Sequence, residues 1–199
     1  MKITKLWEGL KRIANGDYVL DGDLISEAEI EIELDDRLVV RGKIVAKKYI
    51  KAGCGIVAGE GIKAGCGIKA GWGIEAGWGI EAGWGIEAGW GIEAGCGIKA
   101  GWGIEAGEGI EAGEGIKAGW GIVAGWGIVA KTFIHTEKRI FAGVSVYHTS
   151  ENCEKTIKCA ELRKGEIAFG ELIVEVQPVH MTIAEIENAL GIKNLKIKE

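Results

Sequence analysis

The chain has little proline, little histidine and no long apolar run, and each shortage excludes a class of protein. Proline occurs once in 199 residues, so the 34 glycines belong neither to a collagen-like chain nor to a proline-rich linker. No histidine lies between residues 51 and 134. No stretch is long enough to span a membrane, and the N-terminal segment lacks the apolar run of a secretory signal. We therefore expect a cytoplasmic protein without a membrane partner.

Cysteine content and net charge give only weak indications of partners. The five cysteines are an odd number without a metal-type cluster, which favours reduced thiols and predicts no metal or cofactor. Cys153 and Cys159 are close enough in sequence to form a disulfide or share a metal, and free thiols are the alternative. The net charge of −5 is mild and predicts solubility more than any partner.

A six-residue period dominates the chain. Every sixth residue from Ile32 to Val146 is aliphatic, and between residues 51 and 128 the unit is nearly constant, x-Ala-Gly-x-Gly-Ile. A small or apolar residue stands two positions after each aliphatic one, as Ala52 follows Ile50. Positions of the same parity point to one side of an extended chain, so both are expected to face inward. The period predicts a short unit stacked on copies of itself, an all-β, single-chain β-solenoid.

The residue between the two glycines of each unit varies widely, and we expect this position to lie outside. It holds tryptophan, cysteine and glutamate, and lysine towards the ends. No close-packed slot accepts these residues interchangeably, because such volume changes and an unpaired buried glutamate each cost several kcal/mol. The flanking glycines predict a corner whose backbone dihedral angles other residues avoid.

The unit Ala-Gly-Trp-Gly-Ile-Glu resembles the hexapeptide repeat of the left-handed β-helix of bacterial acyltransferases. That repeat reads aliphatic-Gly-x-x-small-x, and here the sizes are swapped, because alanine takes the aliphatic slot and isoleucine the small one. The resemblance implies a triangular, left-handed coil of three hexads. A coil of two hexads is the alternative.

Three parts follow from this pattern: an N-terminal cap of residues 1–26, a hexapeptide-repeat solenoid of residues 27–146 and a C-terminal part of residues 147–199. The cap is expected to hold a short amphipathic helix within residues 1–24, which covers the first coil and stops near Gly16.

The C-terminal part is expected to combine strands with a second short helix. Lys164–Val176 alternates and predicts strands, with a hairpin around Gly170 as one arrangement. Thr182–Leu190 has a capping box and predicts a helix that either caps the solenoid or pairs with a second subunit in a homodimer. The predicted fold is thus a β-solenoid with short helical caps at both ends.

Acidic residues gather in one part of the repeat. With three hexads per coil, Glu75, Glu93 and Glu111 fall in consecutive coils with nothing between them, and Glu108 and Glu114 occupy corners. Like charges on neighbouring strands destabilise a sheet, so a fold that keeps them can use them to bind a basic protein groove, in imitation of nucleic-acid phosphates. The alternative is that glutamate is only a soluble filler.

The corner tryptophans form ladders. The two larger sets are Trp72, Trp90 and Trp126 on one edge and Trp84, Trp102 and Trp120 on another. Exposed aromatic ladders are typical of an interface with a partner protein, a stacked sugar or base, or another copy of the chain. In the alternative interpretation each indole covers the glycine-rich backbone of the next coil.

Other functions fit the sequence less well. Acyltransferases with a related fold use a histidine base near a loop that interrupts the coils, and residues 51–134 have neither. Ice binding needs flat threonine arrays, and no threonine lies between residues 51 and 131. A self-assembling scaffold like the bactofilins is the main alternative, although capped ends would block stacking. We expect no catalytic residues.

The register of xAGxGI hexads, preceded by DGDLI and LDDRLVVRGKI and followed by RIFAG, resembles small repeat proteins encoded in phages and mobile elements of Gram-positive bacteria. The tail MTIAEIENALG also looks like the ends of phage proteins. This resemblance implies an inhibitor of host defence, such as an anti-CRISPR protein. We therefore expect a non-enzymatic protein that binds a nucleic-acid-handling host protein through its acidic, tryptophan-lined surface, without binding nucleic acid directly.

Overall fold

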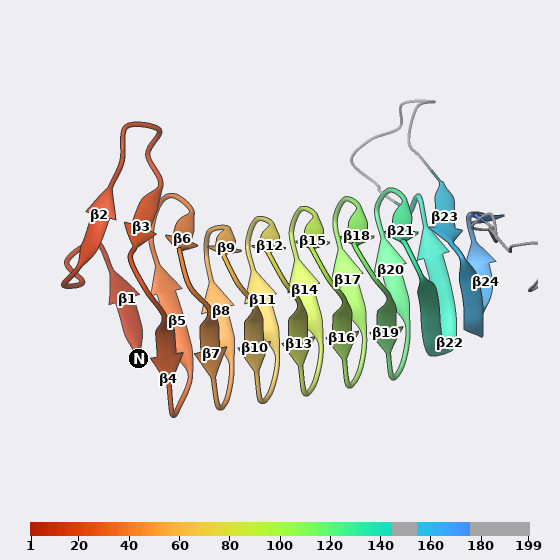
Figure 1. The fold of residues 1–199 in the computed structure, drawn as a ribbon, viewed down its shortest axis with the longest axis horizontal. Helices are drawn as coiled ribbons and strands as arrows, with labels where there is room; N and C mark the ends of the chain where they lie inside the picture. The colour runs from red at the N-terminus through yellow and green to blue at the C-terminus, as the bar shows by residue number, and fades with distance from the viewer. Residues whose placement is uncertain (145–154, 176–199) are drawn as a thin grey trace, which may run out of the picture.

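The computed structural model describes residues 1–144 and 155–175, which form a parallel β-solenoid (Figure 1). These residues contain strands and turns and no helix. The strands form one sheet of 15 and another of 10, and along the repeat the neighbours within each sheet come from successive coils. The all-β solenoid predicted from the six-residue period is confirmed.

The strands are short throughout the repeat and longer at the C-terminal end. The N-terminal strands are β1 (Lys2–Thr4), β2 (Leu10–Arg12), β3 (Tyr18–Leu20), β4 (Leu24–Ser26) and β5 (Ile30–Glu33). The repeat strands are β6 (Leu38–Val40), β7 (Ile44–Ala46), β8 (Ile50–Ala52), β9 (Ile56–Ala58), β10 (Ile62–Ala64), β11 (Ile68–Ala70), β12 (Ile74–Ala76), β13 (Ile80–Ala82), β14 (Ile86–Ala88), β15 (Ile92–Ala94), β16 (Ile98–Ala100), β17 (Ile104–Ala106), β18 (Ile110–Ala112), β19 (Ile116–Ala118), β20 (Ile122–Ala124) and β21 (Ile128–Ala130). The last described strands are β22 (Phe133–Ala142), β23 (Thr156–Cys159), β24 (Glu161–Phe169) and β25 (Glu171–Val174).

One coil of the repeat holds three hexads. β10 pairs in parallel with β13, β11 with β14 and β12 with β15, so each strand lies beside the strand three places later. Residues in register are 18 apart, as Lys63 and Glu81 are. The repeat strands therefore form three columns, one with β10, β13 and β16, one with β11, β14 and β17, and one with β12, β15 and β18. The left-handed coil and the triangular section stay predictions.

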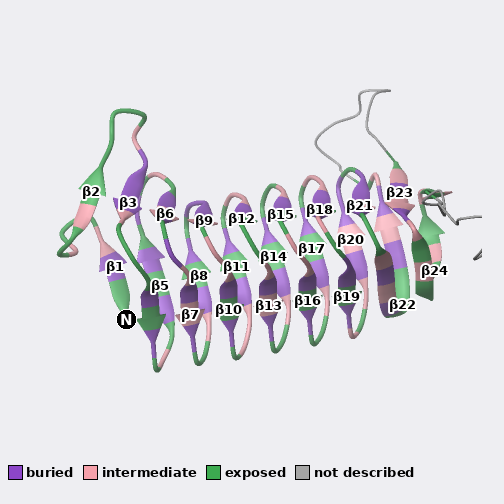
Figure 2. Ribbon diagram, viewed as in Figure 1, coloured by how far each residue is buried: buried purple, intermediate pink, exposed green. Residues whose placement is uncertain are grey.

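The core consists of two kinds of inward position in every strand. Along the repeat, the first residue of each three-residue strand is a buried aliphatic residue, mostly isoleucine, and the third is mostly a buried alanine, while the middle residue points outward. Figure 2 shows this alternation as buried stripes along each coil. Ile74 and Ile92 are each 1% exposed, and full burial of such a side chain contributes about 1.5–3 kcal/mol. The two inward columns predicted from residue parity are confirmed.

The corners explain the glycines by close contact rather than by unusual dihedral angles. A Cβ atom on Gly89 would lie 2.0 Å from the carbonyl oxygen of Gly71 in the preceding coil, whereas one on Gly91 would lie 3.4 Å from that of Gly109. Within the described residues, glycines with positive φ lie outside the regular repeat, from Gly9 to Gly22 and from Gly143 to Gly170. The expectation of special corner dihedrals is therefore wrong. The first glycine of the x-Ala-Gly-x-Gly-Ile unit, such as Gly89, is needed because a side chain there would collide with the carbonyl oxygen of the preceding coil.

The hexad register inferred for the first coil is also wrong. Ile30 pairs with Ile50, and Ile32 pairs with Ala52, so partners here are 20 residues apart. Ile32 thus occupies the alanine column, and the two extra residues widen the turn between β5 and β6, where Leu34 is buried. The corner residue Cys54 is only 1% exposed, unlike the corner tryptophans, and burial raises the pKa of its thiol.

The expected N-terminal helix does not form. Residues 1–24 instead contain β1, which pairs in parallel with β5, and β2, which pairs antiparallel with β3. Gly9 has φ +83° and Gly16 has φ +100°, which are not helical angles. The helical spacing of Leu6, Leu10 and Ile13 was misleading, because Leu6 is 95% exposed and Leu10 lies in the hairpin. These strands supply hydrogen-bond partners for the backbone of the first coil, which a helix would not do.

The parallel stack continues beyond the regular repeat at both ends. β3 and β4 pair in parallel with β6 and β7, and β24 and β25 pair in parallel with β22 and β23. Gly170, with φ +116°, lies in a turn between two columns, so the hairpin considered there is wrong. The helix predicted for Thr182–Leu190, and Cys153, lie outside the described residues.

Candidate functional site

Three glutamates form a continuous row on one column of the solenoid. Glu75, Glu93 and Glu111 are the middle, outward-pointing residues of β12, β15 and β18, and all three are exposed. Glu75 pairs in register with Glu93, and Glu93 with Glu111, so successive carboxylates are about one strand spacing, ~4.8 Å, apart along the axis. Within residues 1–144 and 155–175 none of the three forms an ion pair within 4.0 Å. The consecutive placement predicted from the sequence is confirmed.

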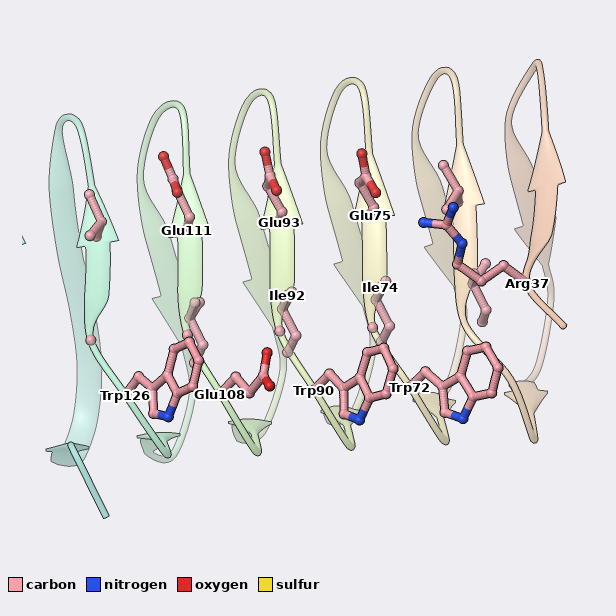
Figure 3. Close-up of a pocket in the computed structure, with 18 residues that line it drawn as sticks. Arg37, Trp72, Ile74, Glu75, Trp90, Ile92, Glu93, Glu108, Glu111 and Trp126 are labelled. Carbon is pink, nitrogen blue, oxygen red and sulfur yellow. The ribbon is translucent and has the colours of Figure 1, made fainter. Parts of the chain in front are cut away.

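A corner row of aromatic residues lies beside these carboxylates. It runs Trp72, Trp90, Glu108 and Trp126, and the backbone N–H of each donates to the carbonyl of the residue one coil earlier, as Trp90 does to Trp72. The indoles of Trp72 and Trp90 stack with ring centroids 5.4 Å apart and planes 8° apart. Figure 3 shows this row and the carboxylate row running side by side along the same coils. Trp90 is 52% exposed, so the stacked pair remains accessible to solvent.

The two rows border one groove of about 760 Å³, which we call the acidic groove. Its carboxylates are Glu75, Glu93, Glu111 and Glu108, and its indoles are those of Trp72, Trp90 and Trp126. Corner glycines between the rows leave the backbone uncovered by side chains. Val57 and Val129 lie at the two ends of the carboxylate row, in register with Glu75 and Glu111. The outward residues of this column therefore read apolar, three acidic and again apolar.

Arg37 borders the groove at its N-terminal end. Its Nε and Nη2 atoms donate to the two carboxylate oxygens of Asp17 at 3.1 and 2.9 Å. Asp17 is buried, and this bidentate bond from the guanidinium lowers the pKa of its carboxyl group. The same bond raises the pKa of Arg37, with a smaller contribution from the nearby charge of Glu75. Asp17 thus holds the Arg37 side chain, and the positive charge of Arg37 lies at the N-terminal end of the row of glutamates.

The second tryptophan ladder lies on a different edge. Trp84 and Trp102 stack with centroids 5.8 Å apart and planes 14° apart, and Tyr49 meets Trp84 edge-on at 5.5 Å. Lys138 lies 5.7 Å from the ring centroid of Trp120. The structure thus does not bring Trp84, Trp102 and Trp120 into the acidic groove. The strand column next to this second ladder carries Lys69 and Glu87, which form a salt bridge.

A second, smaller groove has mixed charge. It has a volume of about 550 Å³ and contains Trp78 and the predicted site residue Glu114. On its floor Glu81 accepts from Lys63 at 3.0 Å and from Lys99 at 3.2 Å, which lowers the pKa of Glu81. We call Lys63, Glu81 and Lys99 the mixed ladder. Its carboxylate is neutralised from both sides, unlike those of the acidic groove.

The described residues offer little else that resembles a reactive site. They contain no group of three or more His, Cys, Asp or Glu side chains placed to hold a metal ion. Cys54 and Cys159 are buried, and burial raises the pKa of both thiols. The described part of the chain has no helix that could cross a membrane.

Sequence reasoning found the carboxylates and indoles of the groove but missed Arg37 and Asp17. Arg37 directly precedes β6, at the position that a corner glycine occupies in later coils, and its side chain lies over Gly55. The available signal was an arginine at a position that is glycine in the regular hexads. Nothing in the sequence marks Asp17 as buried.

A comparison of the chain with protein-family models, curated proteins and solved structures finds no match. The resemblances to acyltransferases and to phage-encoded repeat proteins therefore stay predictions, and the site is interpreted from its own geometry.

Proposed function

We propose that this chain is a non-enzymatic binding protein whose acidic groove occupies a basic, nucleic-acid-binding surface of another protein. The observation that carries the proposal is the row of three carboxylates that no lysine or arginine of the described residues neutralises at close range, beside stacked indoles. The other charged columns near the middle of the repeat contain at least one close salt bridge.

The spacing of the carboxylates supports the imitation of a nucleic acid. One carboxylate per coil places a negative charge about every 4.8 Å along the axis, and one strand of B-DNA has a phosphate about every 3.4 Å. The two linear charge densities differ by less than a factor of two. Because the glutamates are exposed, their attraction for a basic surface acts at a distance and weakens as salt is added.

The indoles supply what a row of charges lacks. Lysine and arginine side chains attract indole faces by cation–π interactions and pack their methylene groups on aromatic rings. The stacked pair of Trp72 and Trp90 offers such a surface in the same groove as Glu75 and Glu93. Charge would thus govern approach, and the indoles would add apolar contact in the complex.

The more specific proposal is that the chain is a phage-encoded inhibitor of a host defence protein of the anti-CRISPR type. Its support is the resemblance of the xAGxGI hexads and their flanking segments to small repeat proteins of phages and mobile elements.

Charge reversal with a matched control tests the proposed function. One variant combines Glu75→Lys, Glu93→Lys and Glu111→Lys, and the control combines Glu81→Lys, Glu87→Lys and Glu105→Lys, which are outward middle residues of the other columns. Both change the net charge equally. A partner captured from a host lysate and then purified should bind the native chain and the control, and lose at least about tenfold in affinity for the groove variant. Unchanged binding to the groove variant would refute the proposal.

Competition with duplex DNA tests the kind of surface that the partner uses. If the acidic groove occupies a nucleic-acid site, added DNA should release the purified partner from the native chain. A partner that binds DNA and this chain at the same time would contradict the nucleic-acid-mimic part of the proposal.

A further inference from the structure

We infer that the acidic groove accepts an α-helix of its partner, with lysine or arginine at successive helical turns, rather than an extended segment. This inference rests on the proposed function and names the partner element that the groove fits. Its basis is the match between the rise of the solenoid and the spacing of side chains in each kind of secondary structure.

The carboxylates are evenly spaced along the groove. Glu75, Glu93 and Glu111 are in register on adjacent strands, so they lie at about 0, 4.8 and 9.6 Å along the axis. In an α-helix, residues i, i+3 or i+4, and i+7 share one face and lie at about 0, 4.5–6 and 10.5 Å. The third position therefore differs by only about 1 Å, which flexible basic side chains absorb.

Extended segments do not keep this register. Side chains on one face of a β-strand recur about every 6.6 Å, so the third lies at about 13 Å and misses its carboxylate by more than about 3 Å. A polyproline II helix repeats about every 9.3 Å and would meet only alternate carboxylates. Three consecutive ion pairs therefore favour an α-helix.

The ends of the row agree with an amphipathic helix. Val57 and Val129 continue the row of outward residues in register on either side of the glutamates. From one valine to the other the row spans four coil spacings, about 19 Å, which is the length of about 13 helical residues. A fitting helix would carry three central basic residues with an apolar residue one turn beyond each end.

The width of the groove also suits a helix. The corner residue and the outward glutamate of one coil, such as Trp90 and Glu93, are three residues apart, at most about 10 Å. A helix with its side chains is about 10–12 Å across. One helical face can therefore reach the carboxylates while the neighbouring face lies on the stacked indoles of Trp72 and Trp90.

Two synthetic peptides of identical composition test this inference. Both are alanine-based, about 14 residues long, and contain three lysines and two leucines. In the helical peptide the lysines stand at i, i+4 and i+7, and in the alternating peptide they stand at i, i+2 and i+4. Isothermal titration calorimetry with the intact chain measures affinity, and far-ultraviolet circular dichroism measures helix formation on binding.

The helical peptide should bind at least about tenfold more tightly and should gain helical signal in the complex. Trp90→Ala and Glu93→Gln should each weaken it, while the matched change Glu105→Gln on another column should not. Equal or tighter binding of the alternating peptide would overturn the helix inference. If that tighter binding is lost in the triple groove variant, the proposed function stands without the helix. If both peptides bind native and triple-variant chains equally, the acidic groove itself is refuted as the site.

Discussion

The acidic groove and the mixed ladder share one backbone but differ in how their charges are compensated. Glu93 on β15 has Glu75 and Glu111 as its neighbours in register, whereas Glu81 on β13 has Lys63 and Lys99. The inward isoleucines and alanines beneath them are equally buried. The difference in charge compensation comes from the outward residue of each strand.

This comparison separates what the fold requires from what it leaves open. The inward positions and the first corner glycine of each hexad are constrained by packing, and they hardly vary along the repeat. The outward position accepts lysine, glutamate or valine at little structural cost. A row of three like charges is therefore not demanded by the coil, and this freedom is why we assign function to it.

The largest expected effect tests whether the two faces share the same core. Ile92→Ala beneath the acidic groove and Ile98→Ala beneath the mixed ladder should each cost about 2–5 kcal/mol of unfolding free energy, because each leaves a cavity at a site 1% exposed. Chemical denaturation of both variants should give losses that agree within about 1 kcal/mol. Markedly unequal losses would mean that the faces differ inside as well as outside.

A smaller effect is expected at the corner that borders the acidic groove. Gly89→Ala should lower the unfolding free energy by about 1–3 kcal/mol, because the new methyl group would lie 2.0 Å from the Gly71 carbonyl oxygen and force the coils apart. Gly91→Ala is the matched control, with 3.4 Å to the nearest such oxygen, and should change stability by less than about 1 kcal/mol. Equal effects, measured by thermal unfolding, would contradict the steric account of the corner.

The smallest effect compares the two kinds of carboxylate directly. Glu81→Gln should cost at most about 1 kcal/mol at neutral pH, since it removes two exposed salt bridges. Glu93→Gln should be neutral or slightly stabilising, because it removes like-charge repulsion between neighbouring strands. Denaturant midpoints of both variants against the native chain measure the difference. A larger loss from Glu93→Gln would show that its carboxylate has a structural partner.

The pH dependence of Glu81 sharpens the same comparison. Lys63 and Lys99 lower the pKa of Glu81 in the folded chain, so this group stabilises the fold above its unfolded pKa. That stabilisation is lost as the pH falls through the lowered folded pKa. The stability difference between native chain and Glu81→Gln should therefore shrink from neutral pH to strongly acidic pH. A difference that grows on acidification would contradict the assigned ion pairs.

Much of the fold could be predicted from the hexad, because its strict period reports the inward side chains directly. Ile74 and Ala76 have the same environment in every coil, so one repeat describes the others. The ends could not be predicted in this way. Leu6, Leu10 and Ile13 have helical spacing, but the segment that contains them forms β1 and β2, which pair with β5 and β3. Strand pairing with the rest of the fold therefore overrides the local helical pattern.

The candidate site could be predicted as two separate rows but not as one groove. The sequence placed Glu75, Glu93 and Glu111 in one column and Trp72, Trp90 and Trp126 in another, and the structure shows that these two columns border each other. The two ladders have the same spacing, but Trp72 and Trp90 each stand three residues before a glutamate of the row, and Trp84 and Trp102 do not. The structure adds that both rows border one groove, which Arg37 also lines.

The most direct test of the central claim observes the two tryptophan ladders during binding of a basic helix. Each indole N–H gives its own signal in a proton–nitrogen nuclear magnetic resonance spectrum of the 15N-labelled chain, and the helical lysine peptide is the titrant. We predict that the indole signals of Trp72, Trp90 and Trp126 shift with added peptide while those of Trp84, Trp102 and Trp120 keep their positions. Equal shifts on both edges, or shifts on the second edge alone, would contradict the assignment of function to the acidic groove.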